Sequence, residues 1–141
     1  MANKLSPRLA AVVAALPLRK GMRVLEIGCG PGAAAREIAE RVAPGYVLGI
    51  DRSRKAIAQA RAACADLLQA KRMGLRCVAI EDFELAEDAA PYDLAFAVRV
   101  GVLDGRHPAK QARALERIRA ALTKRGSLWI GDGADVQKLA L

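Results

Sequence analysis

The chain has 141 residues, enough for one domain with a hydrophobic core. Hydrophobic residues make up 53% of it and aromatic residues only 4%, which excludes a disordered chain and predicts an aliphatic core. The net charge of +8 is compatible with an anionic partner, but nucleic acid is not favoured, because the arginines are spread over helical segments and no basic run is interleaved with aromatic residues.

The N-terminal segment predicts a helix over residues 7–16. Ser6 and Pro7 suit an N-cap and a first helical residue, and apolar residues recur at helical spacing from Leu5 to Leu16. A signal peptide is the alternative, because Lys4 and Arg8 precede an apolar run, but the cap favours the helix.

The three cysteines give little sign of chemistry. Cys29, Cys64 and Cys77 are odd in number and lack a metal-binding spacing, so we expect no disulfide framework and no metal site. A reducing, cytoplasmic location follows most simply. No apolar stretch approaches the roughly 18 residues that span a bilayer, so we expect no membrane association.

The next element organises the chain. An apolar strand over residues 22–27 ends in Glu26 and Ile27, and the glycine-rich loop of residues 28–32 leads into a helix. Glycine allows the tight turn and a close approach to a ligand, and the free N–H groups of the helix start favour a negative group. The sequence therefore predicts a ligand site at this loop.

Two kinds of cofactor suit such a loop. The spacing of Gly28, Gly30 and Ala33, with Asp51 further on, fits the dinucleotide pattern. However, Glu26 stands two residues before the first glycine, where a carboxylate is out of place beside a pyrophosphate. That position suits a ligand that carries a positive charge.

Strands and helices alternate along the rest of the chain. The pattern predicts helices over 32–42, 53–73 and 108–122, and strands over 46–50, 75–80, 94–98 and 127–130. Such alternation indicates right-handed crossovers and a parallel sheet. Asp93 at the amino end of the fourth strand is expected to be structural, and the loop after that strand carries Asp104, Arg106 and His107.

The loop with its preceding acid, Glu26-x-Gly28-x-Gly30-x-Gly32, resembles the first motif of class I S-adenosylmethionine-dependent methyltransferases. The resemblance covers residues 5–133. It implies a single domain with an α/β fold: a doubly wound, mostly parallel five-stranded sheet of order 3-2-1-4-5 with helices on both faces. It also implies that Glu26 and the loop, Cys29 included, hold the amino-acid end of S-adenosyl-L-methionine.

The resemblance assigns further cofactor contacts. Asp51, with Arg52 beside it, stands where the family places an acid for the ribose hydroxyls. Asp82 and Phe83 are the candidates for the adenine amino group and the adenine ring, with Glu81 as the alternative to Asp82.

The methyl acceptor is less defined. His107, the only histidine, stands in a loop suited to a general base, although a solvated histidine at a helix start is the simpler interpretation. The motifs that mark adenine, glutamine and cytosine methylation do not follow the fourth strand. We therefore expect transfer to an oxygen or nitrogen atom of a small molecule.

The chain differs from the family at its end. Only nine residues follow Asp132, so we expect the fold without strands 6 and 7 and an exposed edge on strand five. A homodimer through that edge is predicted. The alternative function is a non-catalytic S-adenosylmethionine-binding or assembly protein, and a nicotinamide-dependent enzyme is a weaker third.

Overall fold

The computed structural model describes residues 5–103 and 105–141, so Lys4 and Asp104 lie outside the described residues. A six-stranded sheet of order β3-β2-β1-β4-β5-β6 forms the centre of the molecule. The pairs from β3 to β5 are parallel, and only β5 and β6 are antiparallel. The strands are β1 (Arg23–Ile27), β2 (Tyr46–Asp51), β3 (Met73–Cys77), β4 (Tyr92–Val98), β5 (Leu122–Gly131) and β6 (Gln137–Leu139).

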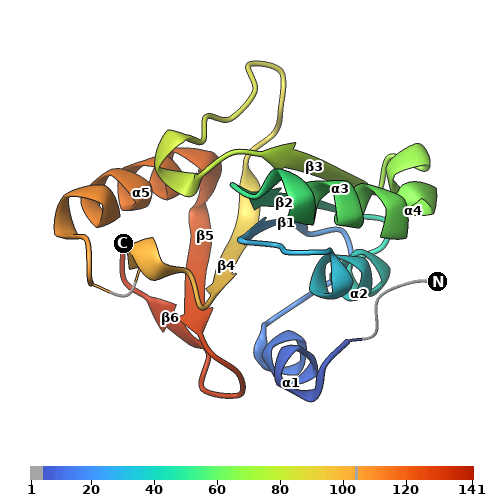
Figure 1. Ribbon diagram of the computed structural model, residues 1–141, viewed down its shortest axis with the longest axis horizontal. Coiled ribbons are helices and arrows are strands. Elements are labelled where there is room, and N and C mark those ends of the chain that lie inside the picture. Colours follow the sequence, from blue (N-terminus) through green and yellow to red (C-terminus); the bar gives the residue numbers. More distant parts are fainter. Residues whose placement is uncertain (1–4, 104) are drawn as a thin grey trace.

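Helices cover both faces of the sheet, as the sequence predicts. Figure 1 shows α5 on one side and the other four helices on the opposite side. The helices are α1 (Pro7–Ala15), α2 (Ala33–Arg41), α3 (Arg54–Ala63), α4 (Ala65–Gln69) and α5 (Pro108–Ala121), with short 3₁₀ turns η1 (Ile80–Asp82) and η2 (Gly101–Leu103). Within the described ranges, no helix is long and apolar enough to cross a membrane.

The two faces of the sheet bury separate aliphatic clusters. Val24 and Leu94 pack with α1 and α2, and Leu25 and Leu128 pack with α5. All four side chains are fully buried. Strands β1 and β4 are buried on both faces because helices lie above and below them, which explains their nearly continuous apolar sequences.

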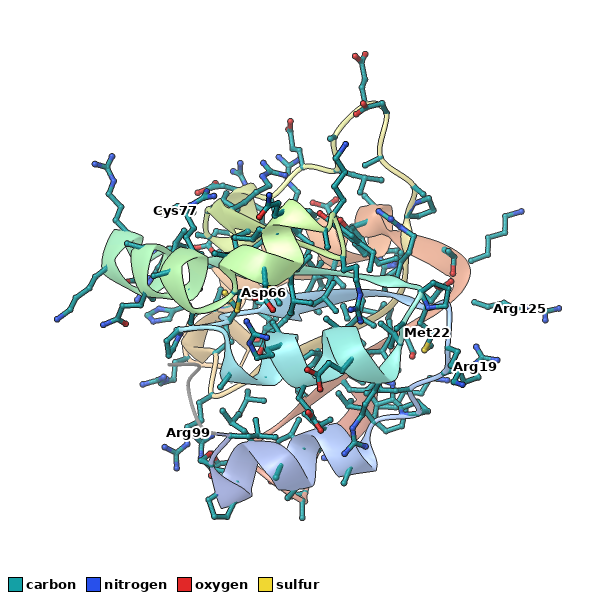
Figure 2. The ribbon with its side chains drawn as sticks, turned by 90° about the vertical axis from the view of Figure 1, so that its right-hand side faces the viewer. Arg19, Met22, Asp66, Cys77, Arg99 and Arg125 are labelled. Carbon is teal, nitrogen blue, oxygen red and sulfur yellow. The ribbon has the colours of Figure 1, made fainter. Side chains whose placement is uncertain are left out.

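The two ends of the sheet have different roles. At the amino end, the Asp93 carboxylate accepts a hydrogen bond from Arg23 N at 2.9 Å and joins β4 to β1, the structural role expected for it. In Figure 2, Arg99 and Cys77 lie at the carboxyl ends of their strands, and Arg19, Met22 and Arg125 lie at the opposite end of the molecule. Ligands of open parallel sheets bind at the carboxyl end.

The end of the chain corrects one expectation. Strand five is not the edge of the sheet, because β6 pairs with it at residues 128–130. The turn between β5 and β6 is short because the Asp135 carboxylate accepts hydrogen bonds from Asp132 N at 2.9 Å and Gly133 N at 2.8 Å. A side chain at Gly131 would overlap Val136, so glycine permits the tight return. The predicted exposed edge on strand five is therefore wrong.

Some boundaries also differ from those predicted. The long helix predicted over 53–73 is broken at Cys64, whose thiol turns toward Gly32 O at a distance of 3.8 Å. Gly74, which directly follows the predicted helix, lies inside β3 and pairs with Leu48. Strand β3 ends at Cys77, and Ile80, the last residue of the predicted strand, begins η1.

Candidate functional site

The glycine loop after β1 has the backbone that its sequence predicts. Gly28, Gly30 and Gly32 have φ angles of 74°, 54° and 94°, in the left-handed region that other residues rarely adopt. A Cβ on Gly28 would lie 3.0 Å from Val100 Cγ2, so the loop lies directly against the segment after β4. No side chain caps the start of α2 at Gly32. The three glycines thus place backbone atoms without side chains at the carboxyl end of the sheet.

Asp51, the last residue of β2, links this loop to that strand by a hydrogen bond. Its Oδ2 accepts a hydrogen bond from Gly30 N at 2.9 Å, and its Oδ1 accepts one from Ser53 N at 2.9 Å. Gly28 N and Cys29 N also donate to Ile50 O at 2.8 and 2.9 Å. A carboxylate oxygen has more than one acceptor position, so both oxygens of Asp51 keep capacity for a ligand hydroxyl.

Glu26 is the one charged residue among the buried ones that the structure describes. It is only 4% exposed, and its Oε1 has no hydrogen-bond partner in the described protein. Burial, followed by the nearby charge of Asp51, raises the pKa of Glu26 to about 8. A buried carboxyl without a partner is costly to a fold, so its place beside the glycine loop calls for a positively charged or hydrogen-donating ligand.

Cys29 is a packing residue within this loop. Its side chain is buried, and Gly49 on β2 has no room for a Cβ because Cys29 Sγ would lie 3.0 Å from it. Burial, then Glu26 and Asp51, raises the pKa of the Cys29 thiol. The thiol is therefore neutral, and it lies too deep to act as a nucleophile.

A cavity of about 450 Å³ lies across the carboxyl ends of β1, β2 and β4. Four residues of the predicted site line it: Gly28, Asp51, Arg52 and His107. Glu26, Cys29, Gly30 and Gly32 lie outside the lining, in or just before the loop that bounds it. The structure therefore brings the predicted ribose acid, the glycine loop and the histidine to one cavity.

The segment after β3 is arranged differently from the sequence-based preference. Glu81 lines the cavity, whereas Asp82 and Phe83 do not. The Asp82 carboxylate lies 3.6 Å from the Arg113 guanidinium on α5, and Phe83 is 1% exposed in the core. The geometry favours Glu81, the alternative kept open above, as the acid that faces a ligand.

His107 lies at the start of α5 and is exposed. It is the N-cap residue of that helix, its side chain makes no capping hydrogen bond, and its carbonyl accepts from Gln111 N at 2.8 Å. It lines the cavity with Arg106 and Lys110, which the sequence analysis did not assign to the site. Arg106 lies in the loop between β4 and α5, and Lys110 lies in the first turn of α5. Their place after the carboxyl end of a buried parallel strand was the available signal, because ligands bind at such ends.

These residues fit S-adenosylmethionine. The molecule carries an ammonium, a sulfonium, a ribose and an adenine. The described residues offer an orphaned buried carboxyl oxygen for a cation, an aspartate at a strand end for the ribose, and a glycine loop where a side chain would obstruct approach.

Comparison with known proteins agrees with this fit. The family described as "Methyltransferase domain" matches residues 18–140. Over 60 residues the chain is 37% identical to a trans-aconitate 2-methyltransferase of Delftia acidovorans (strain DSM 14801 / SPH-1), covering 43% of this chain and 22% of that protein.

Two solved structures resemble the fold. One is a phosphoethanolamine N-methyltransferase of Haemonchus contortus in complex with phosphoethanolamine and S-adenosylhomocysteine, with a TM-score of 0.75 and 17% identity over 90% of this chain and 25% of that one. The other is a SAM-dependent methyltransferase of Geobacter sulfurreducens in complex with S-adenosylhomocysteine, with a TM-score of 0.68 and 26% identity over 94% of this chain and 50% of that one.

The chain spans half or less of the length of each of these relatives. Its match to the family nevertheless runs from before β1 to β6 and takes in the whole glycine loop. The chain belongs to the family of S-adenosylmethionine-dependent methyltransferase domains.

Proposed function

We propose that this domain binds S-adenosyl-L-methionine and transfers its methyl group to an oxygen or nitrogen atom of a small molecule. The observation that carries the proposal is the buried Glu26 carboxyl, whose Oε1 has no protein partner, beside a glycine loop that Asp51 holds. Glu26 would hold the ammonium, Asp51 the ribose hydroxyls and Glu81 the adenine amino group.

The cofactor, when bound, supplies a methyl group on a sulfonium together with its own leaving group. The protein then has to align donor and acceptor and to exclude water, which can provide much of the rate. Gly28 and the segment after β4 approach each other closely enough to form one wall of such a site. His107 is available to accept a proton from an acceptor that must lose one.

A non-catalytic binding protein on the same fold is the second candidate. The exposure of His107 favours it, because the cavity has no buried, oriented base among the described residues. Binding of the cofactor without transfer to any acceptor would support this alternative.

Asp51→Asn provides the first test. We expect its affinity for S-adenosylmethionine to fall about tenfold or more, since one amide cannot accept both backbone hydrogen bonds and still bind ribose hydroxyls. Calorimetric titration measures the affinity. Asp93→Asn is the matched control, because Asp93 also accepts a backbone N–H at 2.9 Å but lies at the other end of the sheet.

Two results would overturn the proposal. The first is wild-type protein that does not bind S-adenosylmethionine or S-adenosylhomocysteine. The second is a loss of affinity in Asp93→Asn equal to that in Asp51→Asn, because the effect would then report general destabilisation. Transfer of labelled methyl groups to a panel of acceptors distinguishes the enzyme from the binding protein.

A further inference from the structure

A second hollow of about 310 Å³ lies at the carboxyl ends of β4 and β5. Its walls are apolar and come from Ala97, Leu103 and Ile130. It shares Arg99, Val100 and Arg106 with the cavity described above, so the two hollows adjoin. A molecule in the second hollow would face the first across these shared residues.

Charge is distributed unevenly over the two hollows. The carboxylates that line the first cavity, Asp51 and Glu81, lie on the side of β2 and β3, together with Arg52. Arg99, Arg106 and Lys110 line it on the side of β4 and α5. Within the described residues, the lining of the second hollow contains two arginines and no carboxylate. The second hollow therefore has two guanidinium groups at its mouth and apolar walls.

Arg99 lies at this mouth and is paired with an aspartate. Its φ angle is 56°, which residues other than glycine rarely adopt, and its Nε is ion-paired with the Asp132 carboxylate in the turn before β6. Arg8 of α1 approaches the same carboxylate at 3.8 Å. This pairing uses Arg99 Nε, and a guanidinium has further N–H donors on its terminal nitrogens.

Arg106 lies over Gly101, which has no side chain. Its Nη2 lies 2.8 Å from the point where a Cβ on Gly101 would stand, so the guanidinium lies over that glycine. Both guanidinium groups thus come from the segment between β4 and α5, which also supplies the apolar Leu103.

We propose that the second hollow holds the methyl acceptor and that this acceptor is a carboxylate with an apolar body. The inference rests on the function proposed above. Guanidinium groups pair with carboxylates through two parallel hydrogen bonds, and the apolar walls suit a hydrocarbon chain or ring. Arg99 and Arg106 select the charge, and Leu103 and Ile130 contact the body.

A carboxylate acceptor needs no general base, which agrees with the exposed position of His107. A carboxylate oxygen already has a free electron pair. It forms the new O–C bond while the electrons of the C–S bond go to sulfur, so an anion and a sulfonium become a neutral ester and a neutral thioether. No proton is released at the acceptor, and no general base is required. His107, which lines the first cavity and not the second hollow, is then not needed as a base.

Binding of octanoate to the protein without cofactor tests this proposal. We expect octanoate to bind at least about tenfold more tightly than octanamide, the neutral analogue, and Arg106→Gln to remove that preference. Arg117→Gln is the control, since Arg117 pairs with Glu84 and lies outside both linings.

Equal affinity for octanoate and octanamide would overturn the proposal, and so would displacement of octanoate by an equal concentration of inorganic phosphate, which would show an unselective anion site. The test is independent of the proposed function. If S-adenosylmethionine binds and octanoate does not, the acceptor class is wrong and the function stands. If octanoate binds and S-adenosylmethionine does not, the function itself fails.

Discussion

At the scale of single residues, Glu26 is the residue that most directly links the fold to the proposed function. A protein that needed only a strand at this position would place an apolar residue there, because both neighbouring strands bury their side chains. Instead the chain keeps a carboxyl group whose Oε1 lacks a partner. Such a group lowers stability at neutral and higher pH, and binding of a cation offsets the cost.

The stability of the protein should therefore depend on pH through Glu26. Its pKa in the folded protein is raised from 4.5 to about 8, so the folded state holds a proton that the unfolded state releases. The stabilisation that this proton gives to the folded state is fully present below pH 4.5. It is lost as pH rises through 8, by at most about 1.4 kcal/mol for each pH unit. Urea unfolding at several pH values measures this slope.

Glu26→Gln isolates the effect. We expect this variant to lose the slope between pH 5 and 8 and to be more stable than wild type at the upper end, because an amide does not ionise. Glu40→Gln, a change at an exposed position of α2, should leave the slope unchanged. An unaltered slope in Glu26→Gln would show that Glu26 does not titrate in this range.

At the scale of elements, the alternation of apolar runs with amphipathic helices predicts a parallel sheet, and the family resemblance implies the order of its first five strands, which the structure confirms. The break at Cys64 was not predictable, since it depends on a contact between that thiol and Gly32, 32 residues away. Strand β6 was missed because the turn before it is closed by the Asp135 carboxylate, which periodicity does not detect.

The candidate site was predictable to a similar extent. The resemblance identified the strand-end acid Asp51, which lines the cavity, and the loop glycine Gly28 beside it. Glu81 lines the cavity, whereas the Asp82 carboxylate lies 3.6 Å from the Arg113 guanidinium of α5. No local pattern shows that contact, so the choice between Glu81 and Asp82 could not be made from the sequence.

Gly28→Ala tests the glycine loop as an element. Alanine at this position would have to keep a positive φ angle, and its methyl group would lie 3.0 Å from Val100 Cγ2. We therefore expect a loss of about 1–2 kcal/mol in stability and weaker binding of S-adenosylmethionine. Gly21→Ala is matched, because Gly21 also has a positive φ angle but has open space around it and lies before β1. It should lose stability and keep its affinity. Equal affinities in the two variants would contradict the role of the loop.

At the scale of the whole molecule, the sheet has edges at β3 and at β6, and the edge beside β5 is β6. This strand has only three residues, and its outer backbone groups have no neighbouring strand among the described residues. Native proteins seldom leave such an edge bare, so we propose that a second copy of the chain pairs with it. This proposal replaces the predicted dimer through strand five, because β6 pairs with that strand.

Light scattering on size-fractionated protein tests this proposal. We expect a mass twice that of the chain at high concentration and a decrease toward the single chain on dilution. A mass equal to one chain at every concentration would exclude the homodimer. The predicted cytoplasmic location stays a prediction, and localisation of the tagged protein in cells would test it.

The central claim is that Glu26 and the glycine loop receive the cationic end of S-adenosylmethionine, and its most direct test is calorimetric titration at pH 7 in buffers of different ionisation enthalpy. Since the pKa of Glu26 is about 8, the free protein holds a proton there that a bound ammonium should displace. We predict release of close to one proton on binding at pH 7, with little or none at pH 9 or in Glu26→Gln. Binding at pH 7 without proton release, or no binding at all, would contradict the account.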